Sequence, residues 1–224
     1  MSSKINWPWR PLFTFNPVAG CKRGCNFCYA NRLHTMRYEA RRRGAKLPEC
    51  YSKPFTEVRF FPERLKQRFK PGSHVFIGSM SDIEYWHETW IRNIIDYCAM
   101  NPTVNFYFLS KNSIAYSCWT FPDNCCLGLT MTLTQTGQCQ YEMMSEMIRH
   151  KRCFLSLEPL LGELKVTGIL HMFEKIIIGA MTGPGAVKPE KEWIDSIKKL
   201  EPCFAHSGGL RNIYWKNNIR KGKR

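Results

Sequence analysis

Seven short apolar runs, separated by segments with helical spacing, constrain the fold of this chain more than any other feature. They are rich in Val, Ile, Phe and Leu and do not alternate with polar residues, which is typical of strands buried on both faces of a parallel sheet. The runs span residues 12–15, 75–78, 104–109, 126–131, 153–157, 175–180 and 213–215.

Helical patterns lie between these runs, at residues 29–43, 62–69, 89–100, 138–150 and 190–200. A strand–helix–strand order repeated about six times indicates an α/β fold with a mainly parallel sheet. The 224 residues are fewer than the roughly 250 of a complete eight-fold barrel. We therefore predict one domain over residues 1–224, a partial (β/α)6-type barrel with an N-terminal extension (1–10) and a basic tail (217–224).

The composition points to a cytoplasmic protein with a polyanionic partner. Lys and Arg number 33 against 18 Asp and Glu, a net charge of +15, which favours nucleic acid as a partner. No run approaches the roughly 18 to 20 apolar residues of a membrane helix, and residues 1–10 lack the apolar core of a secretory signal. The 11 cysteines are therefore not expected to form a secreted disulfide scaffold.

Three cysteines follow the first strand within eight residues, Cys21, Cys25 and Cys28, in the pattern C-x3-C-x2-C. Thiolates this close together, in a loop with two glycines, can hold a single cluster. A four-iron, four-sulfur cluster usually takes four cysteines, so three leave one iron open for another ligand. An open coordination position is typical of catalytic rather than structural metal sites.

Other interpretations of the three cysteines remain. A structural zinc site needs a fourth ligand, and the sequence offers no second Cys or His pair at ligand spacing. A redox pair of Cys25 and Cys28 leaves Cys21 unexplained. Three buried free thiols are the third alternative, and clustering in a glycine-containing loop argues against it.

The triplet, with Phe27 before its third cysteine, resembles the radical S-adenosylmethionine (SAM) superfamily. Residues 15–21 and 28–30 are similar to the branch with spore-photoproduct-lyase-like proteins. The later segments resemble a phage-associated radical-SAM family of unassigned function; they are residues 78–82, 108–111, 127–130, 155–162, 177–184 and 214–216. Many members of that family have a longer insert between the first two cysteines, and this chain lacks a cysteine-rich C-terminal extension for a second cluster.

The resemblance implies an enzyme with a [4Fe-4S] cluster on the three cysteines. The cluster would cleave SAM reductively to a 5′-deoxyadenosyl radical that takes hydrogen from a substrate, with flavodoxin or ferredoxin as electron donor. The charge suggests that this substrate is a nucleic acid base or a nucleotide, in DNA or RNA modification or repair. A small-molecule or peptide substrate is one alternative, and a non-catalytic, metal-stabilised nucleic-acid-binding module is another.

The resemblance also implies cofactor contacts near the first two strands. Phe27 and Tyr29 flank the third cysteine. Residues Gly78, Ser79 and Met80 lie where the superfamily binds the methionyl amino group, although the glutamate usual at the third place is missing.

Further candidates follow the other strands. The expected catalytic residues are Asp82, Lys111 and Glu158: Asp82 aids the amino-group site or caps a helix, Lys111 meets a carboxylate or phosphate, and Glu158 contacts ribose or substrate. The remaining cofactor candidates are Thr130, Ser156 and Gly179. The hydroxyls of Thr130 and Ser156 either contact ribose or are polar groups at strand ends without a ligand. Gly179 either lets the backbone approach adenine or merely ends a strand.

Overall fold

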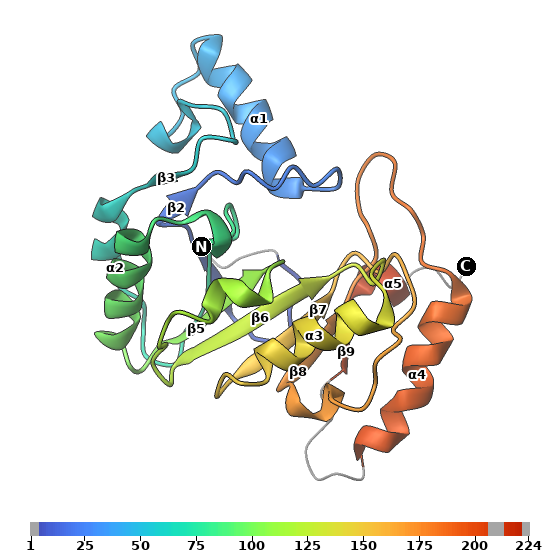
Figure 1. Cartoon of the computed structure of the whole chain (residues 1–224). Helices are drawn as coiled ribbons and strands as arrows, with labels where there is room; N and C mark the ends of the chain where they lie inside the picture. The colour runs from blue at the N-terminus through green and yellow to red at the C-terminus, as the bar shows by residue number, and fades with distance from the viewer. Residues whose placement is uncertain (1–4, 206–212, 221–224) are drawn as a thin grey trace.

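The computed structural model describes residues 5–205 and 213–220, and its centre is one parallel sheet in the order β1-β4-β5-β6-β7-β8-β9 (Figure 1). Apart from the excursion between β1 and β4, neighbouring strands follow chain order, as successive crossovers of one hand produce. The strands are β1 Leu12–Phe15, β4 His74–Ile77, β5 Asn105–Ser110, β6 Cys125–Met131, β7 Cys153–Leu157, β8 Lys175–Ile178 and β9 Ile213–Trp215.

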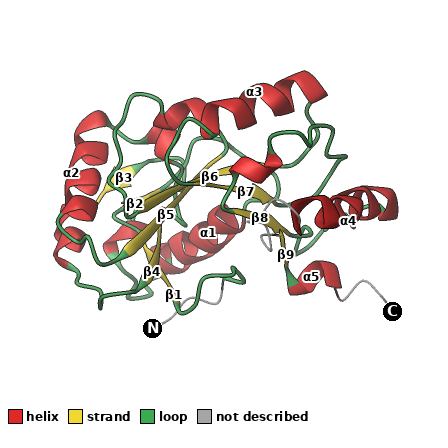
Figure 2. Ribbon diagram, turned by 90° about the horizontal axis from the view of Figure 1, so that it is seen from below, coloured by secondary structure: helices red, strands yellow, loops and turns green. Residues whose placement is uncertain are grey.

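The predicted partial barrel is confirmed. Each of the seven apolar runs forms a strand, and every pairing between neighbours in this sheet is parallel. The strands form an open arc with β1 and β9 at its edges, and helices α2 (Glu88–Ala99), α3 (Gly137–Met147) and α4 (Lys191–Ala205) lie outside it (Figure 2). The arc leaves a concave inner side, on which side chains from different strands can meet.

The helical predictions are correct for four long helices and wrong in detail elsewhere. The α-helices are α1 Tyr29–Arg42, α2 Glu88–Ala99, α3 Gly137–Met147, α4 Lys191–Ala205 and the short α5 Asn217–Arg220. The predicted helix at 62–69 is a 3-10 helix, and the crossovers after β5 and β7 carry only 3-10 turns. The first of these crossovers contains Pro122, and the second contains Pro159, Gly162 and Gly168, residues that disfavour α-helix. In the described ranges, no helix has the length and apolar character needed to cross a membrane.

The outer face of the sheet carries the larger core. Helix α2 contributes Ile91 and Ile94, α3 contributes Met144 and Met147, and α4 contributes Ile197, all at most 5% exposed. These side chains recur at helical spacing, which is why the sequence pattern locates the helices.

The inner face is closed at one end by the N-terminal segment, which is part of the barrel rather than an extension of it. Trp7 is 2% exposed, and its ring centroid lies 4.5 Å from that of Phe76 and 5.4 Å from that of Phe154. Trp9 packs beside it, 4.1 Å from Tyr107. This aromatic group fills the interior of the arc below the strand ends.

Two short strands form a small antiparallel pair: β2 (Val18–Ala19) precedes α1, and β3 (Arg59–Phe60) follows it. Together with α1 this pair forms a lobe over one end of the sheet (Figure 1). The sequence pattern does not reveal strands of two residues, because two positions cannot display a period. The pair matters because the cysteine loop begins immediately after β2.

His34, on the buried side of α1, makes this lobe sensitive to acid. It is 1% exposed, its Nε2 lies 2.9 Å from the Lys53 carbonyl, and its ring packs between Tyr51 and Phe55. A carbonyl only accepts, so Nε2 carries the hydrogen and Nδ1, which is buried without a partner, is bare. Burial lowers the pKa of His34, and the nearby cation of Arg59 lowers it further.

The lowered pKa predicts a loss of stability in acid. In the unfolded chain the histidine side chain binds a proton at about pH 6.5, whereas folded His34 stays neutral at that pH. The stability that His34 contributes is therefore complete above about pH 6.5 and is lost as pH falls. Urea denaturation between neutral pH and about pH 5 should show a steeper decline for wild type than for His34→Gln. Replacing exposed His171 in the same way should leave the wild-type slope, and an unchanged slope in His34→Gln would contradict the assignment.

Candidate functional site

A cavity of about 650 Å³ opens on the inner side of the arc, at the carboxyl ends of the strands. All candidate residues named from the sequence line it except Met80 and Gly179. Those that do are Cys21, Cys25, Phe27, Cys28, Tyr29, Gly78, Ser79, Asp82, Lys111, Thr130, Ser156 and Glu158. Parallel strands bring their carboxyl ends to one edge, which explains why residues far apart in the chain meet here.

The cysteine loop is held by backbone hydrogen bonds to neighbouring segments. The Gly20 amide donates to the Met80 carbonyl at 3.0 Å, and the Cys21 amide donates to the Phe55 carbonyl at 2.8 Å. Gly20 has φ +102°, and an added Cβ there would lie 2.5 Å from the Glu57 carbonyl oxygen. Only glycine therefore fits directly before the first cysteine.

The third cysteine also begins helix α1. Cys28 is its N-cap, and its Sγ accepts from the Asn31 amide at 3.3 Å. The N-terminal end of a helix favours negative charge, so α1 points the favourable end of its dipole at the Sγ of Cys28.

The three thiols are free and half-buried. Burial raises the pKa of Cys21 to about 11 and also raises the pKa of Cys25, an effect that the cation of Lys111 opposes at Cys25. Cys21 and Cys25 therefore hold their protons at neutral pH, and a metal that binds them must displace those protons. Metal binding here should accordingly weaken as pH falls.

Among the described residues, no three His, Cys, Asp or Glu side chains lie close enough together to hold one metal ion. Ligands of a single zinc must all lie about 2.0 to 2.3 Å from one point. Cysteines that hold a four-iron cluster bind different irons and surround it. The three thiols on the wall of this cavity offer sulfur, the donor type that iron–sulfur clusters take from proteins.

Asp82 organises the wall beside the cysteines. It is 7% exposed, and its carboxylate accepts from the Ser110 hydroxyl at 2.6 Å, the Lys111 amide at 3.1 Å and the Glu84 amide at 3.2 Å. The last contact caps a 3-10 helix, as the sequence suggested. With its oxygens engaged in this way, Asp82 acts as a positioning residue that ties β5 to the segment after β4.

Lys111 presents a partly buried cation to the cavity. Its Nζ lies 5.3 Å from the centroid of the Phe27 ring, an arrangement that stabilises a cation. Burial lowers the pKa of Lys111, and the neighbouring Cys25 and Asp82 oppose that shift. A carboxylate or phosphate in the cavity would find a positive partner here.

Glu158 is paired with Lys216, which the sequence analysis did not select. The Nζ of Lys216 donates to both carboxylate oxygens, at 2.5 and 2.7 Å. Gly179 makes room for this pair, because an added Cβ would lie 2.7 Å from Glu158 Oε1 and 2.9 Å from Lys216 Cδ. Gly179 does not line the cavity, although Glu158 and Lys216 both do, and its expected approach to adenine stays a prediction. The position of Lys216 directly after the last strand is the signal that was missed.

Two hydroxyls end neighbouring strands on the cavity wall. Ser156 is 1% exposed and its Oγ is buried without a hydrogen-bond partner; Thr130, its neighbour across the β6–β7 pair, is 7% exposed. A buried unpaired hydroxyl is costly, so one that lines a cavity suggests a polar ligand that completes it.

The glycine segment after β4 is divided between two surfaces. Ser79 lines the cavity and its carbonyl accepts from the Tyr29 hydroxyl at 2.7 Å. Tyr29 itself is 50% exposed, so this hydrogen bond lies at the mouth of the cavity. Met80 does not line this cavity itself but packs against Ala30 and Phe55, two residues of the cavity wall, and its predicted part in the amino-group site stays a prediction.

Comparison with protein-family models gives a match over residues 2–207, most of the chain. The chain belongs to the DUF5131 family. That family is described only as a protein of unknown function. No curated protein and no solved structure matches the chain. The geometry of the cavity therefore carries the functional argument for this DUF5131 protein.

Proposed function

We propose that this DUF5131 protein is a radical SAM enzyme whose cysteine triplet holds a [4Fe-4S] cluster. The observation that carries the proposal is that Cys21, Cys25 and Cys28 line the same cavity as the buried, unpaired hydroxyl of Ser156. Three sulfur donors and a hydroxyl that lacks a hydrogen-bond partner therefore face the same cavity. When bound, the cluster supplies the electron that cleaves SAM to methionine and a 5′-deoxyadenosyl radical.

The chain's own residues bind and orient the reactants. Ser156 and Thr130 offer hydroxyls to the polar groups of SAM, and Lys111 offers a cation to a carboxylate. The hydrogen bonds from Lys216 hold the Glu158 carboxylate at the wall, where it can accept from a sugar hydroxyl. Trp7 closes the floor, which keeps water from the reacting atoms.

We infer a nucleic acid base or nucleotide as the substrate, in modification or repair. The net charge of +15 supports this, because such a surface attracts polyphosphates. Binding to single-stranded DNA and RNA should weaken steeply with added salt, and a flat salt response would remove this part of the proposal. The reaction needs a one-electron donor, and a cytoplasmic flavodoxin or ferredoxin is the class we propose.

Anaerobic reconstitution with iron and sulfide tests the enzyme class. The wild-type protein should turn brown, retain about four irons per chain and release 5′-deoxyadenosine when given SAM and a reductant. A colourless protein that holds one zinc and leaves SAM intact would instead identify a metal-stabilised binding module. An iron-loaded protein that cleaves SAM but ignores nucleic acid would favour a small-molecule or peptide substrate.

A further inference from the structure

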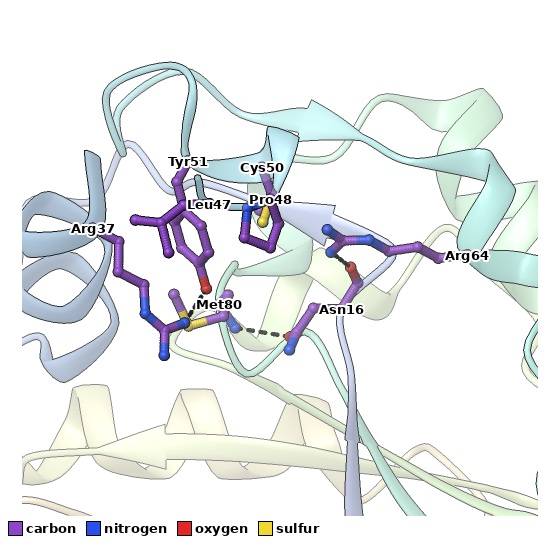
Figure 3. Close-up of a pocket in the computed structure, with 9 residues that line it drawn as sticks. Asn16, Arg37, Leu47, Pro48, Cys50, Tyr51, Arg64 and Met80 are labelled. Atoms are coloured by element: carbon purple, nitrogen blue, oxygen red, sulfur yellow. Dashed lines mark hydrogen bonds between the residues drawn. The ribbon is translucent and has the colours of Figure 1, made fainter. Parts of the chain in front are cut away.

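A second cavity, of about 380 Å³, lies in the lobe formed by α1, the segment that follows it and the β2–β3 pair (Figure 3). It shares no lining residue with the cysteine cavity. We call it the arginine pocket and define it by Asn16, Arg37, Leu47, Tyr51, Arg64 and Met80. Nothing in the proposed radical chemistry uses it.

Two guanidinium groups enter the arginine pocket from opposite sides (Figure 3). Neither Arg37 nor Arg64 lies within ion-pair distance of a carboxylate in the described ranges. The described lining also contains no Asp or Glu. Two like charges facing one enclosed space repel each other, and an anion between them would turn that repulsion into attraction.

Both guanidiniums are already oriented. Arg37 donates to the Tyr51 hydroxyl and lies 5.0 Å from the centroid of its ring. Arg64 donates to the Asn16 carbonyl at 2.5 Å and lies 4.4 Å from the centroid of the Phe61 ring. These hydrogen bonds use one donor of the five that each arginine carries. The remaining donors suit the oxygens of a phosphate, and prior orientation lowers the entropy that binding costs.

The rest of the pocket is mainly apolar. Leu47, Pro48 and the buried Tyr51 lie between the arginines in Figure 3, with Met80 beneath them. A bare phosphate would leave this surface without a partner, whereas a phosphate that carries a flat ring would cover it. Apolar surface with a few placed polar groups is the usual composition of a small-ligand site.

We propose that the arginine pocket binds a nucleotide, with its phosphate between Arg37 and Arg64 and its ring against Leu47, Pro48 and Tyr51. The nucleotide is either free or one unit of a single strand, because both present a phosphate beside a ring. This inference does not depend on the cysteine cavity.

Isothermal titration calorimetry of the full chain tests the proposal. The probes are the four nucleoside 5′-monophosphates, the matching nucleosides, inorganic phosphate and a short single-stranded oligonucleotide. We expect at least one monophosphate, or the oligonucleotide, to bind roughly tenfold more tightly than its nucleoside and than phosphate alone. Binding by monophosphates identifies a free nucleotide as the ligand, and binding by the oligonucleotide alone identifies a strand.

Substitutions locate the site. Arg37→Met and Arg64→Met should each weaken the bound probe about tenfold or more, since charged hydrogen bonds are lost. Arg43→Met is the matched control, because Arg43 is exposed at the end of the same helix and does not line the pocket. Arg64→Lys keeps the charge and the fold but loses the planar guanidinium, which can donate two parallel hydrogen bonds to a phosphate, so it should also weaken binding.

Three results would overturn the proposal: no probe binds, Arg43→Met weakens binding as much as Arg37→Met does, or inorganic phosphate binds as tightly as every nucleotide. The Cys25→Ala variant separates this inference from the proposed function. It should retain nucleotide affinity in the arginine pocket even if it holds no iron.

Discussion

Replacement of Cys25 with alanine is expected to abolish iron binding and, with it, the release of 5′-deoxyadenosine from SAM. The triplet supplies only three protein ligands, so the loss of one leaves two thiols for the whole cluster. The reconstituted variant should be colourless, with iron near the level of protein that was never given iron. Iron per chain and 5′-deoxyadenosine per chain are the two measurements.

The same substitution should leave the fold intact. Cys25 is half-buried in a loop, and substitutions of this kind usually change the free energy of unfolding by no more than about 0.5 kcal/mol. Cys118→Ala is the matched control, because it removes an exposed thiol outside the cavity and should keep both iron and activity. Wild-type iron content in Cys25→Ala, with Cys118→Ala unchanged, would refute the cluster assignment.

Replacement of Trp7 with alanine should lower the free energy of unfolding by about 3 to 5 kcal/mol, the range for truncating a large buried aromatic. Trp7 is 2% exposed and packs on Phe76 and Phe154 inside the arc. Its removal leaves a void at the barrel floor and opens the cavity to water from below. Urea denaturation at fixed pH measures the loss.

Trp119→Ala serves as the comparison for Trp7→Ala. Trp119 is only partly buried and lies 5.4 Å from the guanidinium of Arg92, so its truncation should cost clearly less. Removal of residues 1–9 should destabilise the protein at least as much as Trp7→Ala. Equal losses for the two tryptophans would mean that the N-terminal segment does not close the barrel.

The strand predictions succeed because a strand that is buried on both faces is apolar at consecutive positions, and a short segment of the sequence displays this. Every residue of β6 and of β7 is buried, and an uninterrupted apolar run is the direct consequence. The crossovers after β5 and β7 lack an α-helix for an equally local reason: the sequence shows no helical pattern there, and residues such as Pro122 and Gly162 disfavour one.

Other features carried no local signal. The β2–β3 pair is too short to show a period, and Trp7 lies beside Pro8 in a short stretch of mixed polarity that shows no period either. Lys216 resembles any residue of a basic tail until β9 places it against Glu158. The arginine pocket joins residues from 16 to 80, so no single segment displays it.

The amino-acid sequence by itself determined the succession of strands and helices along the chain, their apolar faces and the close spacing of three cysteines, because each depends on the kind of residue and its spacing along a short segment. Only the tertiary structure decided which polar groups meet: Ser156 unpaired in the cavity, Glu158 on Lys216, and two arginines in one pocket. The physical reason is that hydrogen bonds and ion pairs act over a few ångströms between side chains that the fold brings together.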